Sequence, residues 1–475
     1  MDTIADPAWR LAPAGRRDTE RRPDYRRALR RRLFSADLAV VLCWASTAFA
    51  VSLYLLSGGL ADLKTAADAV NGIGIVAGLA GTNLILIMVL LAARIPWLDR
   101  AVGQDVVMAW HRRLGKPVLY LILAHAVLLT VGYALRDRID VVAETVAFFS
   151  STDLVYGYLA FALLLAVVVT SLLAVRRRLS YELWHLTHLL SYAAVLLALP
   201  HQLSIGGVLA QGTVQRIYWI GLYVVAYGAI LWFRIVKPLL LSARHGLRVA
   251  RVEQHAPDVV SLHLSGRGLD SLGVRGGQYA NWRFLSARDW WHAHPLSFSA
   301  VPADGSLRLT VRTAGSGTHA LSRVRPGTRV LFEGPYGLFT RDARSSPRVA
   351  MVAAGIGVTP LRALLEDLNP SPGEATVLLR ASTESQLYLL DEMEALCQSS
   401  GTAQYADLGA RSEVRSPWLS AASVARGVSL DSVFPRLKDS DLYICGPSEW
   451  AESVAQDAVE AGLKDHQIHV ERFDW

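Results

Sequence analysis

The sequence of 475 residues contains little cysteine: Cys43, Cys397 and Cys445, with no paired spacing. A four-cysteine iron–sulfur cluster, a covalent Cys-x-x-Cys-His haem attachment and a disulfide framework are therefore excluded. Charged residues are also scarce, at 19%, whereas hydrophobic residues make up 52%. This balance lies between that of a soluble protein and that of a chain buried entirely in a membrane. Any haem bound to this chain is held non-covalently, and its electrons come from something other than a ferredoxin module.

A secretory signal peptide is also missing. The first 35 residues carry ten arginines, and no short apolar segment with a cleavage site follows them. Apolar runs long enough to cross a bilayer instead fill the first half of the chain. Six such runs lie near residues 36–57, 71–93, 106–134, 154–175, 182–200 and 214–236, and the third has a polar beginning before Pro117.

Basic residues cluster on one side of these runs: in the N-terminal arm and after the second, fourth and sixth runs. The positive-inside rule then places both termini in the cytoplasm and the protein in the inner or plasma membrane, with the lipid bilayer as its partner. The net charge of +7 follows from this topology and from an arm that lies on anionic lipid. No nucleic-acid partner is expected.

Two histidine pairs lie within these apolar runs. His111 and His125 are 14 residues apart in the third run, and His188 and His201 are 13 apart in the fifth. Each pair spans about 20 Å along a helix, and neutral imidazole is a common axial haem ligand. The pattern predicts two b-type haems at different depths. The inner one is held by His111 and His188, and the outer one by His125 and His201.

The helical geometry tests this prediction. A 14-residue step returns to within about 40° of the same helix face, whereas a 13-residue step misses it by about 140°. The second pair therefore needs a distortion of the helix, which Pro200 can provide next to His201. Without that distortion only one haem is expected, and His185 competes with His188 as a ligand.

The second half of the chain reads as a globular protein. From about Gly246, short alternating segments are punctuated by glycine and proline, as in a small antiparallel barrel. A buried strand from Arg348 then leads into a turn with Gly355 and Gly357 and an amphipathic helix, a pattern that binds a dinucleotide pyrophosphate. The predicted fold is a membrane all-α six-helix bundle, a small antiparallel β-barrel and an α/β parallel-sheet domain. The expected boundaries are 1–35 for the basic arm, 36–236, 243–342 and 345–475.

The motifs of both halves together resemble the ferric reductase / NADPH oxidase superfamily, from the first apolar run to the last residue. That family binds two b-type haems through histidine pairs at these spacings, followed by a ferredoxin-reductase-like half. The resemblance implies three groups of site residues. FAD contacts are Gln278, Tyr279, His294, Pro295, Leu296, Ser297 (beside flavin N5), Gly315, Gly317 and Thr318. Nicotinamide-dinucleotide contacts are Gly355, Gly357, Thr359, Pro360, Cys445, Gly446 and Pro447, and the ring that stacks on the flavin is Phe473 or Trp475.

The resemblance implies transfer of electrons from NADPH through FAD and two haems to an acceptor on the outer face. Arg380, at the end of a strand, is the candidate contact for the 2′-phosphate of NADPH, with NADH as the alternative. Arg112 and Arg113 are candidate partners of the inner haem propionates, or simple inside-positive anchors.

Ferric chelates are the first choice of acceptor and oxygen, reduced to superoxide, the second. The position one turn past His125, where oxygen-reducing members carry a second histidine, is Leu129. A quinone or protein acceptor stays open, and the oligomeric state is not predicted. The alternative of another class is a transporter or sensor whose second half binds a nucleotide as a regulator.

Overall fold

The computed structural model describes residues 25–472, except 62, 176–178, 180, 206, 210–213, 287–289, 314–315 and 414–415. The chain forms two compact units, which are considered separately. One comprises residues 36–95 and 105–234, and the other comprises residues 1–35, 96–104 and 235–475.

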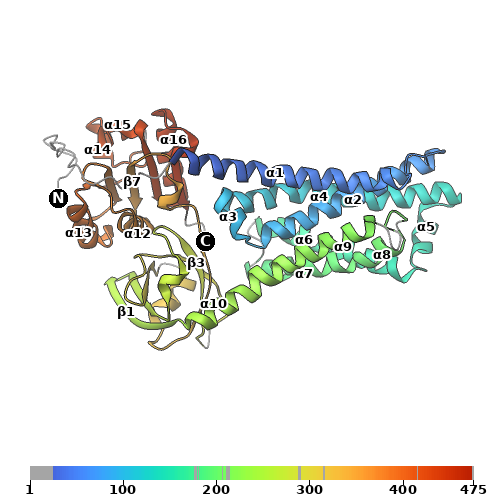
Figure 1. Ribbon diagram of the computed structural model, residues 1–475, viewed down its shortest axis with the longest axis horizontal. Helices are drawn as coiled ribbons and strands as arrows, with labels where there is room; N and C mark the ends of the chain where they lie inside the picture. Colours follow the sequence, from blue (N-terminus) through green and yellow to red (C-terminus); the bar gives the residue numbers. More distant parts are fainter. Residues whose placement is uncertain are drawn as a thin grey trace. The chain divides into compact units, whose positions relative to one another are not determined.

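The helical unit is built from long apolar helices (Figure 1). Within the described residues, six helical stretches are long and apolar enough to cross a membrane: Arg27–Leu56, Ala66–Ala92, Gln104–Asp137, Thr152–Leu173, Leu183–Ser204 and Val214–His245. The helices that form them are α1 (Tyr25–Leu56), α2 (Ala66–Ala92), α4 (Gln104–Asp137), α6 (Thr152–Val175), α7 (Tyr181–Leu197), α8 (Leu199–Ser204), α9 (Val214–Ile230), a π-helical turn (Leu231–Val236) and α10 (Lys237–His245). Shorter helices are α3 (Pro96–Val102) and α5 (Val141–Phe148). The six predicted runs are thus confirmed as helices, most of them longer than predicted.

Local sequence explains several helix ends. Thr65 caps α2 by accepting a hydrogen bond from the amide of Asp68, whose carboxylate accepts one from the Thr65 amide in return. The chain continues as one helix through Pro117 in α4, despite the polar beginning of that run. In the fifth stretch, Ala198 interrupts the helix between α7 and α8, and Pro200 stands in the first turn of α8.

The second unit contains two three-stranded antiparallel sheets. One has the order β1-β2-β5 and the other β4-β3-β6. Their strands are β1 (Arg248–Ala256), β2 (Val259–Ser265), β3 (Tyr279–Phe284), β4 (His294–Ser297), β5 (Ser306–Arg312) and β6 (Val330–Tyr336). Their inward side chains form one apolar core that includes Trp282, Phe298 and Phe332. These two sheets are the small antiparallel barrel predicted from the alternating segments.

A five-stranded parallel sheet of order β11-β10-β7-β8-β9 completes this unit (Figure 1). Its strands are β7 (Arg348–Ala354), β8 (Ala375–Ala381), β9 (Ala403–Leu408), β10 (Ser440–Gly446) and β11 (Ile468–Arg472), and its helices are α12 (Val358–Leu368), α13 (Leu390–Ser400), α14 (Ala421–Ala425), α15 (Leu430–Val433) and α16 (Ser448–Glu460). The chain runs outward from β7 to β9 and then returns to β10 on the other side of β7. The carboxyl ends of β7 and β10 therefore form a topological switch point, where open α/β sheets bind their ligands.

An ion-pair network joins the barrel to the parallel sheet. The guanidinium of Arg308, on β5, donates to both carboxylate oxygens of Glu392 on α13, each at 2.8 Å. Arg362 on α12 donates to Glu392 at 2.6 Å and to Glu366 at 2.8 Å. Its NH1 also reaches the carbonyl of Ser299 at 3.1 Å. Because these half-buried charges are mutually paired, they fix the two antiparallel sheets against the parallel sheet.

Candidate functional site

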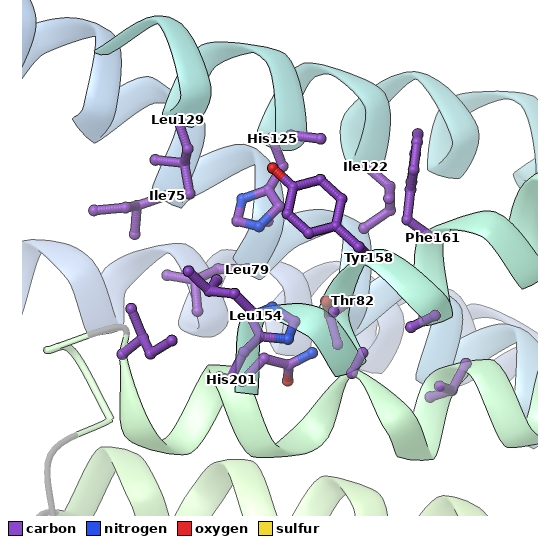
Figure 2. Close-up of a pocket in the computed structure, with 18 of the residues that line it drawn as sticks. Ile75, Leu79, Thr82, Ile122, His125, Leu129, Leu154, Tyr158, Phe161 and His201 are labelled. Carbon is purple, nitrogen blue, oxygen red and sulfur yellow. The ribbon is translucent and has the colours of Figure 1, made fainter. Parts of the chain in front are cut away.

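The outer histidine pair lines a cavity within the helical unit. His125 extends from α4 and His201 from α8, and their ring centroids lie 6.4 Å apart with a 34° angle between the rings. Figure 2 shows both rings pointing into the space between the helices. The fifth stretch is interrupted at Ala198, between α7 and α8 and next to Pro200, where a distortion was predicted. The two rings of this pair do come together.

The inner pair has the same arrangement. The centroids of His111 on α4 and His188 on α7 lie 6.1 Å apart, and the rings are inclined by 58°. The ring that faces His111 thus belongs to His188 and not to the competing His185. The indole of Trp184, one turn before His188, lies 5.4 Å from its ring.

Backbone carbonyls fix the orientation of the two rings on α4. His111 Nδ1 lies 3.0 Å from the carbonyl oxygen of Met88, and His125 Nδ1 lies 2.9 Å from that of Gly74. When Nδ1 carries the proton and donates it, Nε2 is left with its lone pair available for a metal. Within the part of the chain that the structure describes, Nδ1 of His188 and Nδ1 of His201 are buried without a hydrogen-bond partner.

These histidines fit axial haem ligands. Two metal–nitrogen bonds of about 2 Å in line, together with the size of the imidazole rings, place the ring centroids roughly 6 Å apart. Both observed separations agree with this value. No cluster of three or more His, Cys, Asp or Glu side chains suited to a metal ion occurs among the described residues, and a haem needs only two.

The cavity beside the outer pair has a volume of about 390 Å³. Among the described residues that line it, none is Asp, Glu, Lys or Arg. Most are aliphatic or aromatic, as Figure 2 shows for Ile75, Leu79, Ile122, Leu129 and Phe161. Its few polar groups include Thr82, Tyr158 and Gln202, and Gln202 accepts hydrogen bonds from Trp219 at 2.7 Å and from Tyr223 at 3.2 Å. An apolar wall of this kind suits a flat macrocycle and keeps water away from it.

Glycines make room for the outer rings, a feature that the sequence analysis missed. A Cβ on Gly78 of α2 would overlap the ring of His125, and a Cβ on Gly157 of α6 would lie 3.1 Å from His201 Nδ1. Gly74, one turn before Gly78, supplies the carbonyl that binds His125. The signal was present as Gly74-x-x-x-Gly78 in an apolar helix, a spacing typical of close helix packing in membranes.

The predicted flavin residues gather on the sheet β4-β3-β6. Tyr279 on β3 pairs with Ser297 on β4, and both side chains are buried. Ser297 Oγ is buried without a hydrogen-bond partner in the described part of the chain, as expected of a hydroxyl that awaits a ligand. Gln278 uses its side-chain oxygen to accept from the amide of Arg275 at 2.9 Å. His294, Pro295 and Leu296 complete β4. Gly317 and Thr318 lie in the short helix α11 (Ser316–His319).

The two nucleotide motifs meet at the switch point of the parallel sheet. Gly355 has a positive φ of 55° and begins the turn after β7. A Cβ on Gly357 would overlap the carbonyl of Cys445, the penultimate residue of β10. Thr359 Oγ1 donates to the carbonyl of Ile356 at 2.9 Å, and Pro360 follows in the first turn of α12. Only glycine at position 357 lets the turn approach β10 this closely.

Cys445 is fully buried at this point, followed by Gly446 and Pro447. Burial, and then the negative charge of Glu471, raise the pKa of the Cys445 thiol well above its usual value. The thiol is therefore neutral at physiological pH and is not a thiolate nucleophile. Glu471 pairs with Cys445 across β11 and is itself buried, and the sequence analysis had not given it a role.

Arg380 lies in a different environment from the one predicted. Its side chain is 3% exposed, it forms an ion pair with Asp407 at 3.3 Å, and it donates to the carbonyls of Trp418 at 3.2 Å and Gly409 at 2.7 Å. It also donates to the carbonyls of Ala381 and Asp407. The guanidinium thus binds groups inside the fold, although Arg380 also contributes to the lining of a small hollow beside Gly355, and its contact with a 2′-phosphate stays a prediction. Buried arginine with carbonyl partners leaves little capacity for a ligand.

Three other predicted positions, Gly315, Phe473 and Trp475, lie outside the described residues. Strand β11 can be followed to Arg472, opposite Gly446. Arg112 and Arg113 are exposed on α4 beside His111.

Comparison with known proteins agrees with both halves of this description. Residues 77–199 match the ferric reductase like transmembrane component, and residues 351–456 match the oxidoreductase NAD-binding domain. Ferredoxin--NADP reductase B of Sorangium cellulosum is 31% identical over 194 residues, which are 38% of this chain and 77% of that protein. The chain therefore combines a ferric reductase like transmembrane component with a FAD/NAD-binding half of the ferredoxin-reductase type, and its homologues include NADPH oxidases and ferredoxin reductases. It is a multi-pass membrane protein and an NAD(P)H-dependent oxidoreductase that binds FAD.

Two further comparisons show the extent of the likeness. Respiratory burst oxidase homolog protein D of Arabidopsis thaliana is 27% identical over 179 residues, which are 30% of this chain and only 19% of the plant protein. The FAD/NAD-binding domain of nitric oxide dioxygenase from Vibrio cholerae aligns with 48% of this chain and 99% of its own length, at 22% identity and a TM-score of 0.40. The match of residues 351–456 to an oxidoreductase domain argues against the alternative, in which the chain is a transporter or sensor and the nucleotide only regulates it.

Proposed function

We propose that this protein carries electrons from cytosolic NAD(P)H across the membrane, using FAD and two b-type haems, to an acceptor on the outer face. The observation that carries this proposal is that the four histidines face each other in two pairs, His111 with His188 and His125 with His201. Both have the separation of axial ligands, and within each set the ring on α4 is oriented by a backbone carbonyl. When bound, FAD accepts two electrons as a hydride and releases them singly, and haem iron carries one at a time.

The chain's own residues supply position and environment. His111 and His188 hold the inner haem and His125 and His201 the outer one, while the uncharged cavity wall excludes water from it. The carbonyls of Met88 and Gly74 keep Nε2 of their histidines unprotonated. Arg112 and Arg113 are proposed to neutralise the inner propionates.

In the cytosolic half, the buried strand pair β3–β4 holds the flavin, with Ser297 Oγ directed to its reactive side. The proposed contacts are Gln278, Tyr279, His294, Pro295, Leu296, Ser297, Gly315, Gly317 and Thr318, with Phe473 or Trp475 over the ring. The turn from Gly355 to Pro360 binds the pyrophosphate at the amino end of α12, where amides and the helix dipole favour negative charge. Cys445, Gly446 and Pro447 border the nicotinamide.

The proposed orientation has both termini in the cytoplasm of the inner or plasma membrane. The compact unit that contains the flavin and nucleotide sheets also includes the described residues 25–35 and the segment 96–104, which contains α3. In α3, the carboxylate of Asp99 accepts a hydrogen bond from the amide of Gly337 at 3.3 Å. These are two of the segments that the positive-inside rule assigned to the cytoplasmic side, so the contacts support the orientation.

Ferric chelates remain the first choice of acceptor, reduced at the outer face without entering the protein. One observation favours oxygen as the second choice: the wall of the outer cavity has no Asp, Glu, Lys or Arg among its described residues. A small neutral molecule enters such a space without the desolvation cost of an anionic chelate.

Haem counting tests the proposed ligands. Replacing His125 with alanine should reduce the haem content of the purified protein from two per chain to one, because the outer iron loses a ligand. His185→Ala is the matched control, since it removes an imidazole of the same helical unit while the ring that pairs with His111 is that of His188. Two haems retained in His125→Ala would contradict the assignment.

The acceptor is tested in vesicles with the flavin side exposed to nucleotide. Ferric citrate enclosed in the vesicle should be reduced to ferrous iron at a rate that superoxide dismutase does not change. If iron reduction disappears when superoxide is removed, oxygen is the direct acceptor.

A further inference from the structure

A path of hydrogen-bonded hydroxyl groups crosses the sheet β1-β2-β5 of the barrel. It begins at His255 on β1, whose Nε2 lies 2.8 Å from Ser261 Oγ on β2. Ser261 Oγ lies 2.6 Å from Oγ1 of Thr310, its cross-strand partner on β5. Thr310 Oγ1 in turn donates to Ser299 Oγ at 2.8 Å. These side chains, from three strands and the segment after β4, form one continuous hydrogen-bonded path.

The two ends of this path differ in their surroundings. His255 is exposed to solvent, whereas the three hydroxyl-bearing residues are at most 4% exposed. His255 is the extra residue of a β-bulge, because the register of β1 against β2 shifts between Gln254 and Ala256. A β-bulge changes the direction of a side chain, and the bulged imidazole here contacts Ser261. The path therefore leads from the surface of the barrel into a place that bulk water does not reach.

The hydrogens of these groups all point inward along the path. Ser299 Oγ accepts from Thr310 and also from the guanidinium of Arg308, at 3.1 Å. Because Thr310 uses its hydrogen on Ser299, Ser261 donates to Thr310. The hydrogen between His255 and Ser261 then belongs to Nε2 of the imidazole. The hydroxyl hydrogen of Ser299 is left for an acceptor beyond the inner end of the path.

The inner end of the path lies beside the proposed flavin site. Ser297 and Ser299 flank Phe298, whose ring belongs to the apolar core of the barrel, so both hydroxyls lie on the opposite face of the chain. Ser297 Oγ is buried and has no hydrogen-bond partner in the described part of the chain. Residues two apart in an extended chain are separated by about 7 Å, a distance that one water molecule between two hydroxyls bridges.

We propose that this path carries the proton that the flavin releases when its electrons pass to haem, from Ser297 to solvent at His255. The proposal rests on the proposed electron path. A hydride brings two electrons and one proton to the flavin, whereas haem iron takes electrons only. One proton must therefore leave for every two electrons.

The proton moves by exchange along the path. Each hydroxyl forms an O–H bond with the proton from its inner neighbour and gives up its own hydrogen to the next group. The neutral imidazole of His255 accepts the last hydrogen at Nε2 and releases a proton to solvent. The inward-pointing hydrogens described above are those that remain after one such passage, and rotation of the hydroxyls restores the starting state.

The test uses the full-length protein with FAD bound, purified in detergent and kept anaerobic. The flavin is reduced with one equivalent of NADH or NADPH and then oxidised by ferricyanide, which takes electrons one at a time. Recovery of the flavin absorbance and release of protons to a pH indicator are followed in H2O and in D2O. We expect proton release to keep pace with flavin oxidation, and both to slow in D2O. Reduction of the flavin by neither nucleotide would overturn the proposed function, whereas the variants concern the path alone.

Thr310→Val breaks the path at its centre and nearly keeps the shape of the side chain. Flavin oxidation and proton release should slow about tenfold or more, with the FAD content unchanged, and Thr310→Ser should retain the wild-type rates. Thr328→Val is the matched control, because the Thr328 hydroxyl donates to the carbonyl of Arg325 at 2.7 Å in a turn of the same barrel. Wild-type rates in Thr310→Val, or equal slowing in Thr328→Val, would overturn the inference.

The surface end of the path covers the case in which Thr310→Val loses its FAD. His255→Ala should slow proton release, and imidazole added to the buffer should restore the rate by replacing the lost side chain. His263→Ala is the control, since His263 on β2 bonds to Glu253 at 2.9 Å, outside the path. An unchanged rate in His255→Ala, or slowing that imidazole does not reverse, would overturn the inference.

Discussion

At the scale of single residues, the nucleotide site depends on the lack of a side chain at position 357. Gly357 has no Cβ, and the carbonyl of Cys445 lies where that atom would be. The two motifs are 88 residues apart in the sequence, and this contact brings them to one point. The thiol beside it is buried and neutral, so the role that we propose for it is to shape the nicotinamide side of the site.

Replacement of Cys445 by alanine should therefore slow flavin reduction by NAD(P)H about tenfold or more, because small errors in the placement of reacting atoms are costly. The rate constant is measured at saturating nucleotide by anaerobic stopped flow. Cys397→Ala is the control, since Cys397 is also a buried thiol but lies in α13 within the sheet core. An unchanged rate in Cys445→Ala would remove Cys445 from the site.

The sequence predicted residue identities better than residue contacts. The four histidines could be chosen from their spacing and their apolar surroundings, and the structure brings them together in the predicted pairs. The carbonyls of Met88 and Gly74 that orient His111 and His125 were not predictable, because they lie 23 and 51 residues away. The partners of Arg380 inside the fold were not predictable either, because its position at a strand end does not reveal which way its side chain turns.

At the scale of elements, α2 is the helix that seats the outer histidine. Gly74, Gly78 and Gly81 lie at spacings of four and three, and a Cβ on any of them would meet a side chain of α4. Close approach of the two helices allows the His125 ring to bond with the Gly74 carbonyl. The three glycines thus determine how closely α2 approaches the proposed haem ligand His125.

The variant Gly78→Ala tests this element. Its methyl group would overlap the ring of His125, so the outer haem should be lost or weakened while the inner haem is kept. The haem-to-protein ratio and the reduced spectrum measure both effects. Gly115→Ala is the control, because nothing lies within 4 Å of a Cβ at that position of α4. Full haem content in Gly78→Ala would show that α2 does not constrain His125.

The break between α7 and α8 shows where periodicity fails as a guide. An ideal helix through the fifth run would place His188 and His201 on different faces. The sequence therefore predicted the second pair only if Pro200 distorts the helix. In the structure the helix is interrupted at Ala198, and the ring of His201 pairs with that of His125. By contrast, Pro117 is tolerated within α4, so a proline alone does not show whether a membrane helix will break.

At the scale of the whole molecule, the flavin and nucleotide sheets must keep a fixed geometry for hydride transfer. Glu392 carries much of this contact through Arg308 and Arg362. Burial opposes the charged form of Glu392, but hydrogen bonds and charge from these two arginines outweigh it, and its pKa lies below the usual range.

This pairing predicts a pH dependence of stability. Because the folded pKa of Glu392 is lowered, its stabilisation is present above the usual glutamate pKa and is lost as the pH falls through the folded value. Thermal unfolding followed by FAD fluorescence should show a lower Tm for Glu392→Gln at pH 7, and the difference should shrink toward pH 4. Glu394→Gln, on the same helix, should have little effect. A difference that stays constant with pH would contradict the assigned pairing.

The central claim concerns the complete electron path, and one spectrum tests it. The purified full-length protein is reduced anaerobically with NADH or NADPH, and haem and FAD are counted per chain. The account predicts two b-type haems and one FAD, all reduced by nucleotide, and a reduced-minus-oxidised spectrum with both haem signals. Absence of haem, or haem that dithionite reduces but neither nucleotide does, would contradict it.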